Sequence, residues 1–296
     1  MKTQTLVLLA FLLTMSVSAN AAAQQPPCPP TPGVPAVQDI ARGRCLFHST
    51  RAFGQDPGGP YASCAICHYG QDKTDHGVHL LQITNRAGQT IEVLRKTPSL
   101  LKATEDFPYG ADGRFDSVQD AARAAILSPV EMRGTSISAD QLDALAAFIL
   151  ALPASDAHPA PSTPAPAPDA QTLQLIAIGK TVFFGKGTCV TCHSDPDFTN
   201  HTITTNQVNL SFTGTTDPGA AFVETGGPVM FKVPSLLFLN ADKPFMHNGA
   251  IARLVQLVRF YNESLLLKLT GREMTGLEYW LRNCLDPRRD PKPATC

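Results

Sequence analysis

The pentapeptide Cys-x-x-Cys-His occurs twice in this chain of 296 residues, at positions 64–68 and 189–193. Two cysteines at this spacing add across the vinyl groups of one haem, and the adjacent histidine reaches the iron from one face. A zinc site would need four ligands, and a redox dithiol would not carry this histidine in both copies. The motifs therefore predict two covalently bound haem c groups, with these thiols and iron ligands: Cys64, Cys67, His68, Cys189, Cys192 and His193.

The segments around the two motifs also resemble each other, which indicates that one module has been used twice. Pro98-Ser99-Leu100-Leu101 and Pro234-Ser235-Leu236-Leu237 stand 136 positions apart, and Asp106 and Asp242 keep the same offset. Upstream, the segment Ile40-Ala-Arg-Gly-Arg-Cys-Leu-Phe47 precedes the first motif, and the similar segment Ile176-Ala-Ile-Gly-Lys-Thr-Val-Phe183 precedes the second.

A proline-rich segment separates the two copies. Six prolines fall within the 17 residues from Pro153 to Asp169, and such a segment is extended and builds no core. We therefore expect a signal peptide over residues 1–23, an N-terminal cytochrome c-like domain over 24–152, a linker over 153–171 and a C-terminal cytochrome c-like domain over 172–296.

Apolar residues at helical spacing predict helices over residues 139–152, 253–261 and 275–282, the first of them after the N-cap residue Ser138. No stretch alternates like a strand over more than a few residues. The expected fold class is all-α, with one covalent haem in each domain.

The N-terminus indicates export. Lys2 precedes about 12 apolar residues and an Ala-x-Ala site, the pattern of a cleaved signal peptide and too short to span a membrane. The net charge of −1 offers no attraction for nucleic acid, and the mean hydropathy of −0.04 argues against membrane spans. We expect a periplasmic protein.

Four cysteines lie outside the motifs, and in an oxidising compartment we expect them to pair. The nearest-neighbour arrangement is Cys28 with Cys45 and Cys284 with Cys296, although four cysteines allow three connectivities.

Both halves resemble the bacterial di-haem cytochrome c peroxidases and their MauG-like relatives. The resemblance covers about residues 40–131 and 176–280 and rests on these elements: Thr97-Pro98-Ser99-Leu100, Asp112-Gly113-Arg114, Glu131-Met132, Val233-Pro234-Ser235-Leu236 and Pro244-Phe245-Met246-His247-Asn248-Gly249.

The resemblance implies that the N-terminal haem reacts with peroxide and that Glu131 acts there as acid and base. It also implies a sixth ligand for the second haem 14 residues after His247, and that residue is Tyr261. Ala125 occupies the corresponding position of the first module, as an open iron requires.

Other ligands stay open at this stage. His76, His79 and Met132 are alternatives for the first haem, and ligation by Met132 would exclude a peroxidase reaction there. Met230, Met246 and His201 are alternatives to Tyr261 for the second haem.

Three features depart from the family pattern. The tryptophan that the family places between its haems is Ala111, and Tyr109 is a substitute relay. An asparagine that binds calcium in the family is Lys96, whose charge opposes a calcium ion. The connection after Met132 is also shorter than in the family.

The leading hypothesis is a di-haem enzyme that reduces hydrogen peroxide at the first haem. Its electrons would come through the second haem from a small soluble donor, a cytochrome c or a cupredoxin. The alternatives are a di-haem electron carrier without enzymatic activity and MauG-like oxidation of a partner protein.

Overall fold

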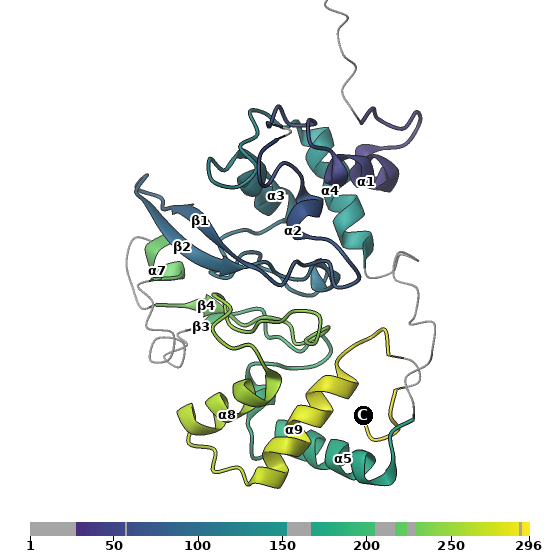
Figure 1. Cartoon of the computed structure of the whole chain (residues 1–296), viewed down its shortest axis with the longest axis vertical. Helices are drawn as coiled ribbons and strands as arrows, with labels where there is room; N and C mark the ends of the chain where they lie inside the picture. The colour runs from purple at the N-terminus through teal and green to yellow at the C-terminus, as the bar shows by residue number, and fades with distance from the viewer. Residues whose placement is uncertain (1–27, 57, 153–166, 205–216, 224–228, 290–291) are drawn as a thin grey trace, which may run out of the picture.

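Two modules, residues 28–152 and 167–296, lie one above the other, and each contains one Cys-x-x-Cys-His motif (Figure 1). The computed structural model describes residues 28–56, 58–152, 167–204, 217–223, 229–289 and 292–296. The expected signal peptide and most of the proline-rich linker lie outside these residues. The predicted domain boundaries therefore stay a prediction.

Helices and one small two-stranded sheet make up each module. The N-terminal module contains α1 (Ile40–His48), α2 (Cys64–Cys67), β1 (Val78–Thr84), β2 (Thr90–Lys96), α3 (Val118–Leu127) and α4 (Ala139–Ala151). The C-terminal module contains α5 (Ala170–Phe184), β3 (Ile203–Thr204), α7 (Ala220–Val223), β4 (Phe231–Lys232), α8 (Leu254–Ser264) and α9 (Gly271–Cys284). Single 3-10 turns occur at Ala36–Gln38, Leu100–Lys102 and Cys189–Thr191.

The three predicted helices are present as α4, α8 and α9. Ser138 caps α4 as expected, since its side chain accepts a hydrogen bond from the Gln141 amide and Gln141 returns one. Helix α9 begins earlier than predicted because Thr270 and Glu273 form a second capping box.

The all-α prediction is wrong, because each module also contains a small antiparallel sheet. Strands β1 and β2 pair over seven residues, and β3 and β4 pair over two. Ile83, Val93 and Arg95 point inward from the first sheet, as an alternating pattern requires. The sequence does not show a clear alternation of apolar and polar residues here, because Leu80 and Leu94 are apolar but lie on the exposed side of the sheet, where they face each other across the strands.

Glycines allow the first and last helices of each module to cross closely. Gly43 of α1 lies against the backbone of Ala144 in α4, where a Cβ atom would clash. Gly179 of α5, which is 136 positions later, lies in the same way against Gly276 of α9. The two halves that repeat in the sequence therefore also pack their terminal helices in the same way.

Both expected disulfides are present. Cys28 is bonded to Cys45, which joins the N-terminal segment to α1, and Cys284 is bonded to Cys296, which joins the end of α9 to the C-terminus. The four motif cysteines are free.

The contact between the modules is nearly symmetric. The Ser99 amide donates to the Asp242 carboxylate at 2.9 Å, and the Ser235 amide donates to the Asp106 carboxylate at 2.7 Å. Ser235 and Asp242 stand 136 positions after Ser99 and Asp106. The two modules therefore exchange equivalent contacts about an approximate two-fold axis.

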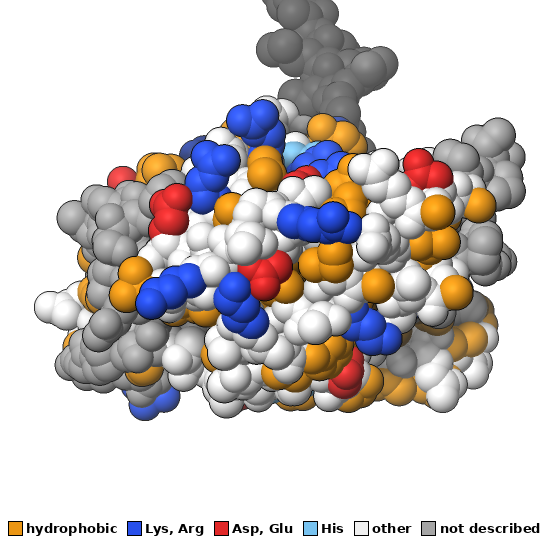
Figure 2. Space-filling model, turned by 90° about the horizontal axis from the view of Figure 1, so that it is seen from below, with side chains coloured by type: hydrophobic (Ala, Val, Ile, Leu, Met, Phe, Trp, Pro, Cys, Tyr) orange, Lys and Arg blue, Asp and Glu red, His pale blue; other side chains and the backbone are white. Residues whose placement is uncertain are grey.

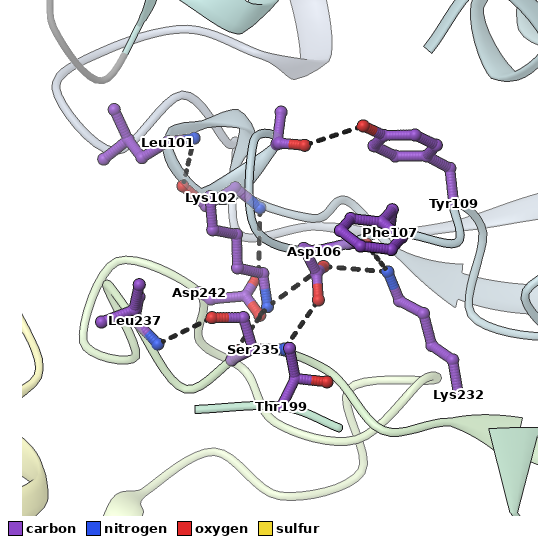
Figure 3. Close-up of polar contacts among 12 residues, drawn as sticks. Leu101, Lys102, Asp106, Phe107, Tyr109, Thr199, Lys232, Ser235, Leu237 and Asp242 are labelled. Atoms are coloured by element: carbon purple, nitrogen blue, oxygen red, sulfur yellow. Dashed lines mark hydrogen bonds and ion pairs between the residues drawn. The ribbon is translucent and has the colours of Figure 1, made fainter. Parts of the chain in front are cut away.

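Lysines neutralise the two buried aspartates (Figure 3). Lys96 pairs with Asp242 at 2.8 Å, and Lys232, its equivalent in the repeat, pairs with Asp106 at 3.0 Å. Lys102 lies between the aspartates, 2.6 Å from Asp242 and 3.5 Å from Asp106. Burial alone would lower the pKa of Lys102, but Asp106 and Asp242 raise it to about 12.

Within the described residues, no helix is long and apolar enough to cross a membrane.

We expect Lys102→Met to destabilise the protein by about 3 kcal/mol, because it leaves two buried carboxylates with less compensating charge. Urea unfolding followed by circular dichroism measures the loss. Lys186→Ala, which breaks the exposed pair between Lys186 and Glu273, is the control and should change stability by about 0.5 kcal/mol or less. Equal losses in the two variants would contradict a special role for Lys102.

Burial would raise the pKa of Asp242, but Lys102 and Lys96 hold it well below its usual range. The stabilisation by Asp242 is therefore complete above about pH 4, the ordinary pKa of an aspartate, and is lost as the pH falls further.

Candidate functional site

Each Cys-x-x-Cys-His motif forms one helical turn. Cys64–Cys67 is the short helix α2, and the His68 amide closes the turn on the Cys64 carbonyl at 2.9 Å. The His193 amide bonds the Cys189 carbonyl at the same distance. A turn of this kind brings two cysteines that are three residues apart to one side of the chain.

Both histidines are oriented by a backbone carbonyl. The Nδ1 atom of His68 lies 3.2 Å from the Lys73 carbonyl, and that of His193 lies 3.1 Å from the Phe198 carbonyl. A carbonyl only accepts, so Nδ1 carries the proton and Nε2 keeps a lone pair. This is the orientation that protein metal ligands commonly have.

Burial sets the protonation of the motif side chains. Burial lowers the pKa of both histidines, that of His193 to about 4, so both are neutral and able to bind iron. Burial also raises the pKa of Cys64 to about 12 and that of Cys189 to about 11, which keeps these thiols uncharged.

The C-terminal core leaves one buried polar atom that a bound group could satisfy. The indole Nε1 of Trp280 is buried and has no hydrogen-bond partner among the described residues. Phe183, Phe184 and Phe198 surround the indole, and Cys189 packs against the same core. Taken together, the residues of both motifs fit a covalently attached haem.

The interface between the modules also holds the loop that orients His68. The Asp242 carboxylate accepts from the Ser99 amide, and the Ser99 hydroxyl donates to the Asp72 carbonyl at 2.5 Å. Asp72 precedes Lys73, whose carbonyl orients His68. The C-terminal module thus supports the histidine of the N-terminal module.

The reverse connection is also present. The Asp106 carboxylate accepts from the Ser235 amide, and the Ser235 hydroxyl donates to the Asp197 carbonyl at 2.6 Å. Asp197 precedes Phe198, whose carbonyl orients His193. Each module therefore positions the predicted iron ligand of the other.

Glu131 lies beside the first motif. Burial raises the pKa of the Cys67 thiol to about 11, and the negative charges of Asp75 and Glu131 raise it further. The pKa of Glu131 is itself raised by burial, although Ser128 and Arg114 oppose the shift. The environment is that of a carboxyl group which holds its proton to a higher pH than an exposed glutamate.

Tyr261 lies in α8 and packs against the core of the C-terminal module, as Cys189 does. Its ring is perpendicular to that of Phe260, with 5.6 Å between the ring centres. Helix α3 is the equivalent of α8, and Ala125 occupies the position of Tyr261 in α3. The difference between Tyr261 and Ala125 that the sequence indicated therefore lies at equivalent positions of two equivalent helices.

Two rival histidine ligands belong to the interface. His76 Nδ1 lies 2.8 Å from the Lys243 carbonyl, and His201 Nδ1 lies 3.0 Å from the Phe107 carbonyl. The two histidines occupy equivalent positions, eight residues after His68 and His193. Their symmetric contacts assign them to the junction between the modules.

His79, which was also considered as a ligand, has both ring nitrogens in hydrogen bonds. Nε2 lies 2.7 Å from the Asp75 carboxylate, and Nδ1 lies 3.2 Å from the Tyr61 hydroxyl.

The methionine alternatives lie in three different settings. The Met132 sulfur is buried 3.9 Å from the Cys64 sulfur. Met246 packs against the C-terminal core, and the Met230 carbonyl accepts from the Ala220 amide. Met132 is therefore the methionine closest to the first motif.

The departures at positions 96 and 111 have structural counterparts. The Lys96 ammonium group already supplies a positive charge to Asp242, where a calcium ion would compete with it. The Ala111 carbonyl accepts from the Lys232 amide, and its equivalent, the His247 carbonyl, accepts from the Lys96 amide. Ala111 and His247 thus lie on the two sides of the approximate axis.

A buried cluster beside this axis was not anticipated. Arg95 pairs with Asp112 and Asp217, and Asp217 lies 3.5 Å from His247. The His247 ring stacks on Phe231 with 4.0 Å between the ring centres. No sequence pattern indicated these contacts, because Asp217 lies outside both motifs and their repeat.

Comparison with known proteins agrees with this geometry. Residues 38–155 match the model of the family described as di-haem cytochrome c peroxidase. Over 253 residues the chain is 26% identical to the methylamine utilization protein MauG of Methylorubrum extorquens, which covers 76% of this chain and 68% of that protein.

Solved structures show the same fold. A MauG-like protein associated with microbial copper homeostasis superposes with a TM-score of 0.61 at 19% identity. The superposition covers 90% of this chain and 96% of the chain of that protein. The diheme peroxidase BthA of Burkholderia thailandensis superposes with a TM-score of 0.61 at 18% identity, over 88% of each chain. Hydrazine synthase of Kuenenia stuttgartiensis gives 0.58 at 17% identity, over 94% of this chain and 99% of its own.

Proposed function

The chain is related to the di-haem cytochrome c peroxidase and MauG family. We propose that it is an exported di-haem c-type cytochrome that reduces hydrogen peroxide. Peroxide reacts at the N-terminal haem, and electrons arrive through the C-terminal haem. The observation that carries this proposal is the asymmetry between equivalent sites. The first site has Glu131 and Ala125, where the second has Leu267 and Tyr261.

The residues that hold the two groups are those of the motifs. Cys64, Cys67 and His68 hold one haem in the N-terminal module, and the second is held by Cys189, Cys192 and His193, with Tyr261 as sixth ligand. A bound haem supplies an iron that exchanges electrons with peroxide or with a redox partner.

Glu131 manages the proton in this proposal. Reduction of hydrogen peroxide consumes two electrons and two protons and gives two water molecules. A carboxylate beside the open site takes the proton from one peroxide oxygen and returns it to the other, which makes the departing oxygen a better leaving group. Desolvation of this half-buried side chain raises its pKa, so the group holds a proton to a higher pH than an exposed glutamate does.

Tyr261 gives the second site a different role. An occupied sixth position favours electron transfer, whereas an open one favours reaction with peroxide. An anionic phenolate also stabilises oxidised iron more than a neutral thioether does. The second haem therefore serves to relay electrons.

An acidic electron donor suits the surface of the C-terminal module. Figure 2 shows Lys and Arg side chains spread over the underside of the molecule, where α8 and α9 lie. Arg253, Arg259, Lys268 and Arg272 are exposed, and none of them forms an ion pair with another described residue. A cytochrome c or cupredoxin with acidic side chains around its redox centre would be attracted to this face.

Export is part of the proposal. The signal peptide expected over residues 1–23 would direct the chain to the periplasm, and the two disulfides are typical of an oxidising compartment.

Two alternatives have specific support. Ligation by Met132, whose sulfur is close to Cys64, would leave an electron carrier without a peroxide site. The relationship to MauG and the presence of Tyr261 favour oxidation of a partner protein instead.

The reaction at the first haem is tested with Glu131→Gln, which keeps the shape of the side chain and removes its basicity. We expect the kcat/KM for peroxide to fall by about 100-fold or more, with unchanged spectra of the resting haems. The wild type should lose activity as the pH falls through the raised pKa of Glu131. The activity of the variant should not show this decrease at low pH.

Glu105→Gln is the matched control, because burial also raises the pKa of Glu105 but its charged neighbours are Asp197 and Asp106 and not residues of the first motif. Electron paramagnetic resonance of the ferric protein should show one high-spin haem that peroxide consumes. Two low-spin haems that peroxide leaves unchanged would refute the peroxidase proposal in favour of the electron carrier.

Tyr261→Phe removes the proposed ligand with little change in volume. We expect the low-spin signal of the second haem to change while the high-spin signal of the first stays the same. Tyr279→Phe, in α9 and against the same core, is the control. If the Tyr261 variant has the wild-type spectrum, another residue binds that iron.

The charge of the donor surface predicts a dependence on salt. With an acidic cytochrome or cupredoxin as donor, kcat/KM should fall as ionic strength rises, because screening weakens the attraction between the proteins. Arg259→Glu and Lys268→Glu should weaken the dependence, and Arg51→Glu on the other module should not. A rate that is indifferent to salt would place the donor elsewhere.

A further inference from the structure

Three side chains beside the first motif form a hydrogen-bonded chain that the proposed function does not use. The Tyr61 hydroxyl lies 3.2 Å from Nδ1 of His79, and Nε2 of His79 lies 2.7 Å from the Asp75 carboxylate. The Tyr61 and His79 rings are perpendicular, with 5.4 Å between their centres. All three side chains are partly buried.

The direction of the hydrogen bonds follows from the chemistry of the groups. Burial would raise the pKa of Asp75, but hydrogen bonds from Gly77, Thr97 and His79 hold it below its ordinary value, so the side chain is a carboxylate. A carboxylate only accepts, so Nε2 of His79 carries the ring proton. Nδ1 is then a base, and the Tyr61 hydroxyl donates to it.

This chain of groups lies next to the predicted haem attachment. One ring nitrogen of His79, a carboxylate oxygen of Asp75 and the Cys67 sulfur all lie within 4.8 Å of one another. The Cys67 sulfur is the atom that would join the haem edge. His79 is therefore in contact with Tyr61 and also lies close to the sulfur that would join the haem.

The second module lacks the same groups. Counted from its motif, the positions equivalent to Tyr61, Asp75 and His79 are Lys186, Asn200 and Thr204. The phenol, the base and the carboxylate are therefore present only in the module that is proposed to react with peroxide.

We propose that Tyr61 is a redox-active tyrosine that supplies an electron to the N-terminal haem after peroxide has oxidised it. The phenol loses one electron to the oxidised haem and its hydroxyl proton to Nδ1 of His79. The products are a neutral tyrosyl radical and an imidazolium, whose charge is paired with the Asp75 carboxylate. When a donor returns one electron to the radical, the proton moves back and the phenol is restored.

The geometry meets the main requirement of this step. Loss of an electron from a phenol that keeps its proton creates a strongly acidic cation, so the proton needs an acceptor already in contact. His79 provides that acceptor, and Asp75 stabilises the charge that His79 gains, as carboxylates do for histidine bases elsewhere. This inference rests on the proposed function, which supplies the oxidant.

The test is electron paramagnetic resonance of the ferric holoprotein, frozen shortly after peroxide is added and with no donor present. We expect a free-radical signal that narrows when the protein contains ring-deuterated tyrosine. Tyr61→Phe should remove the signal. His79→Gln should also remove it, because the amide oxygen still accepts the phenol hydrogen bond but cannot take the proton.

Tyr69→Phe is the matched control, since Tyr69 also flanks the motif but is exposed and has no histidine bonded to its hydroxyl among the described residues. Its radical signal should equal that of the wild type. A signal that survives in Tyr61→Phe, or that is lost in Tyr69→Phe instead, overturns the assignment.

The high-spin haem signal separates the two proposals. If peroxide consumes that signal and no tyrosyl radical forms in the wild type, the role of Tyr61 is refuted while the peroxidase reaction stands. If peroxide leaves that signal unchanged, the proposed function fails and removes the oxidant on which the radical depends.

Discussion

The buried pairing of Asp106 and Asp242 with lysines is the interaction on which the rest of the structure depends. A carboxylate without compensating charge would be costly in this interior, so the two modules come together only where Lys96, Lys102 and Lys232 meet these aspartates. The same carboxylates also accept from backbone amides of the facing module. Those amides belong to Ser99 and Ser235, whose hydroxyl groups bond the loops behind the motif histidines. The pairing of the modules and the orientation of the predicted iron ligands are therefore one arrangement.

Function in this frame comes from departures from symmetry. Both modules have the same crossing of terminal helices, the same motif turn and the same interface serine. They differ where the chemistry is proposed: the half-buried Glu131 acts electrostatically on the first motif, and Tyr261 packs against the same core as the second. The two motif sites are thereby proposed to have different functions, although the modules around them have the same fold.

The sequence was sufficient where structure depends on short-range chemistry. The motif turns, the cap at Ser138, the disulfides between near neighbours and the internal repeat all followed from local patterns and spacing. The β1–β2 hairpin was missed because exposed leucines at positions 80 and 94 hide the alternation. The hydrogen bond between Tyr61 and His79 and the pairing of Arg95 with Asp217 depend on where separate segments meet, and no spacing in the chain encodes them.

The reciprocal contact of Ser99 with Asp242 and of Ser235 with Asp106 has a consequence for the origin of the chain. An interface in which each side offers the same donor and the same acceptor is self-complementary, as in dimers with two-fold symmetry. Two copies of a single-motif ancestor could have formed it before any fusion. Joining two such copies through a proline-rich tether would preserve every contact, and afterwards each half could change alone. Lys102, whose equivalent is Phe238, is a position at the centre of this contact where the two halves differ.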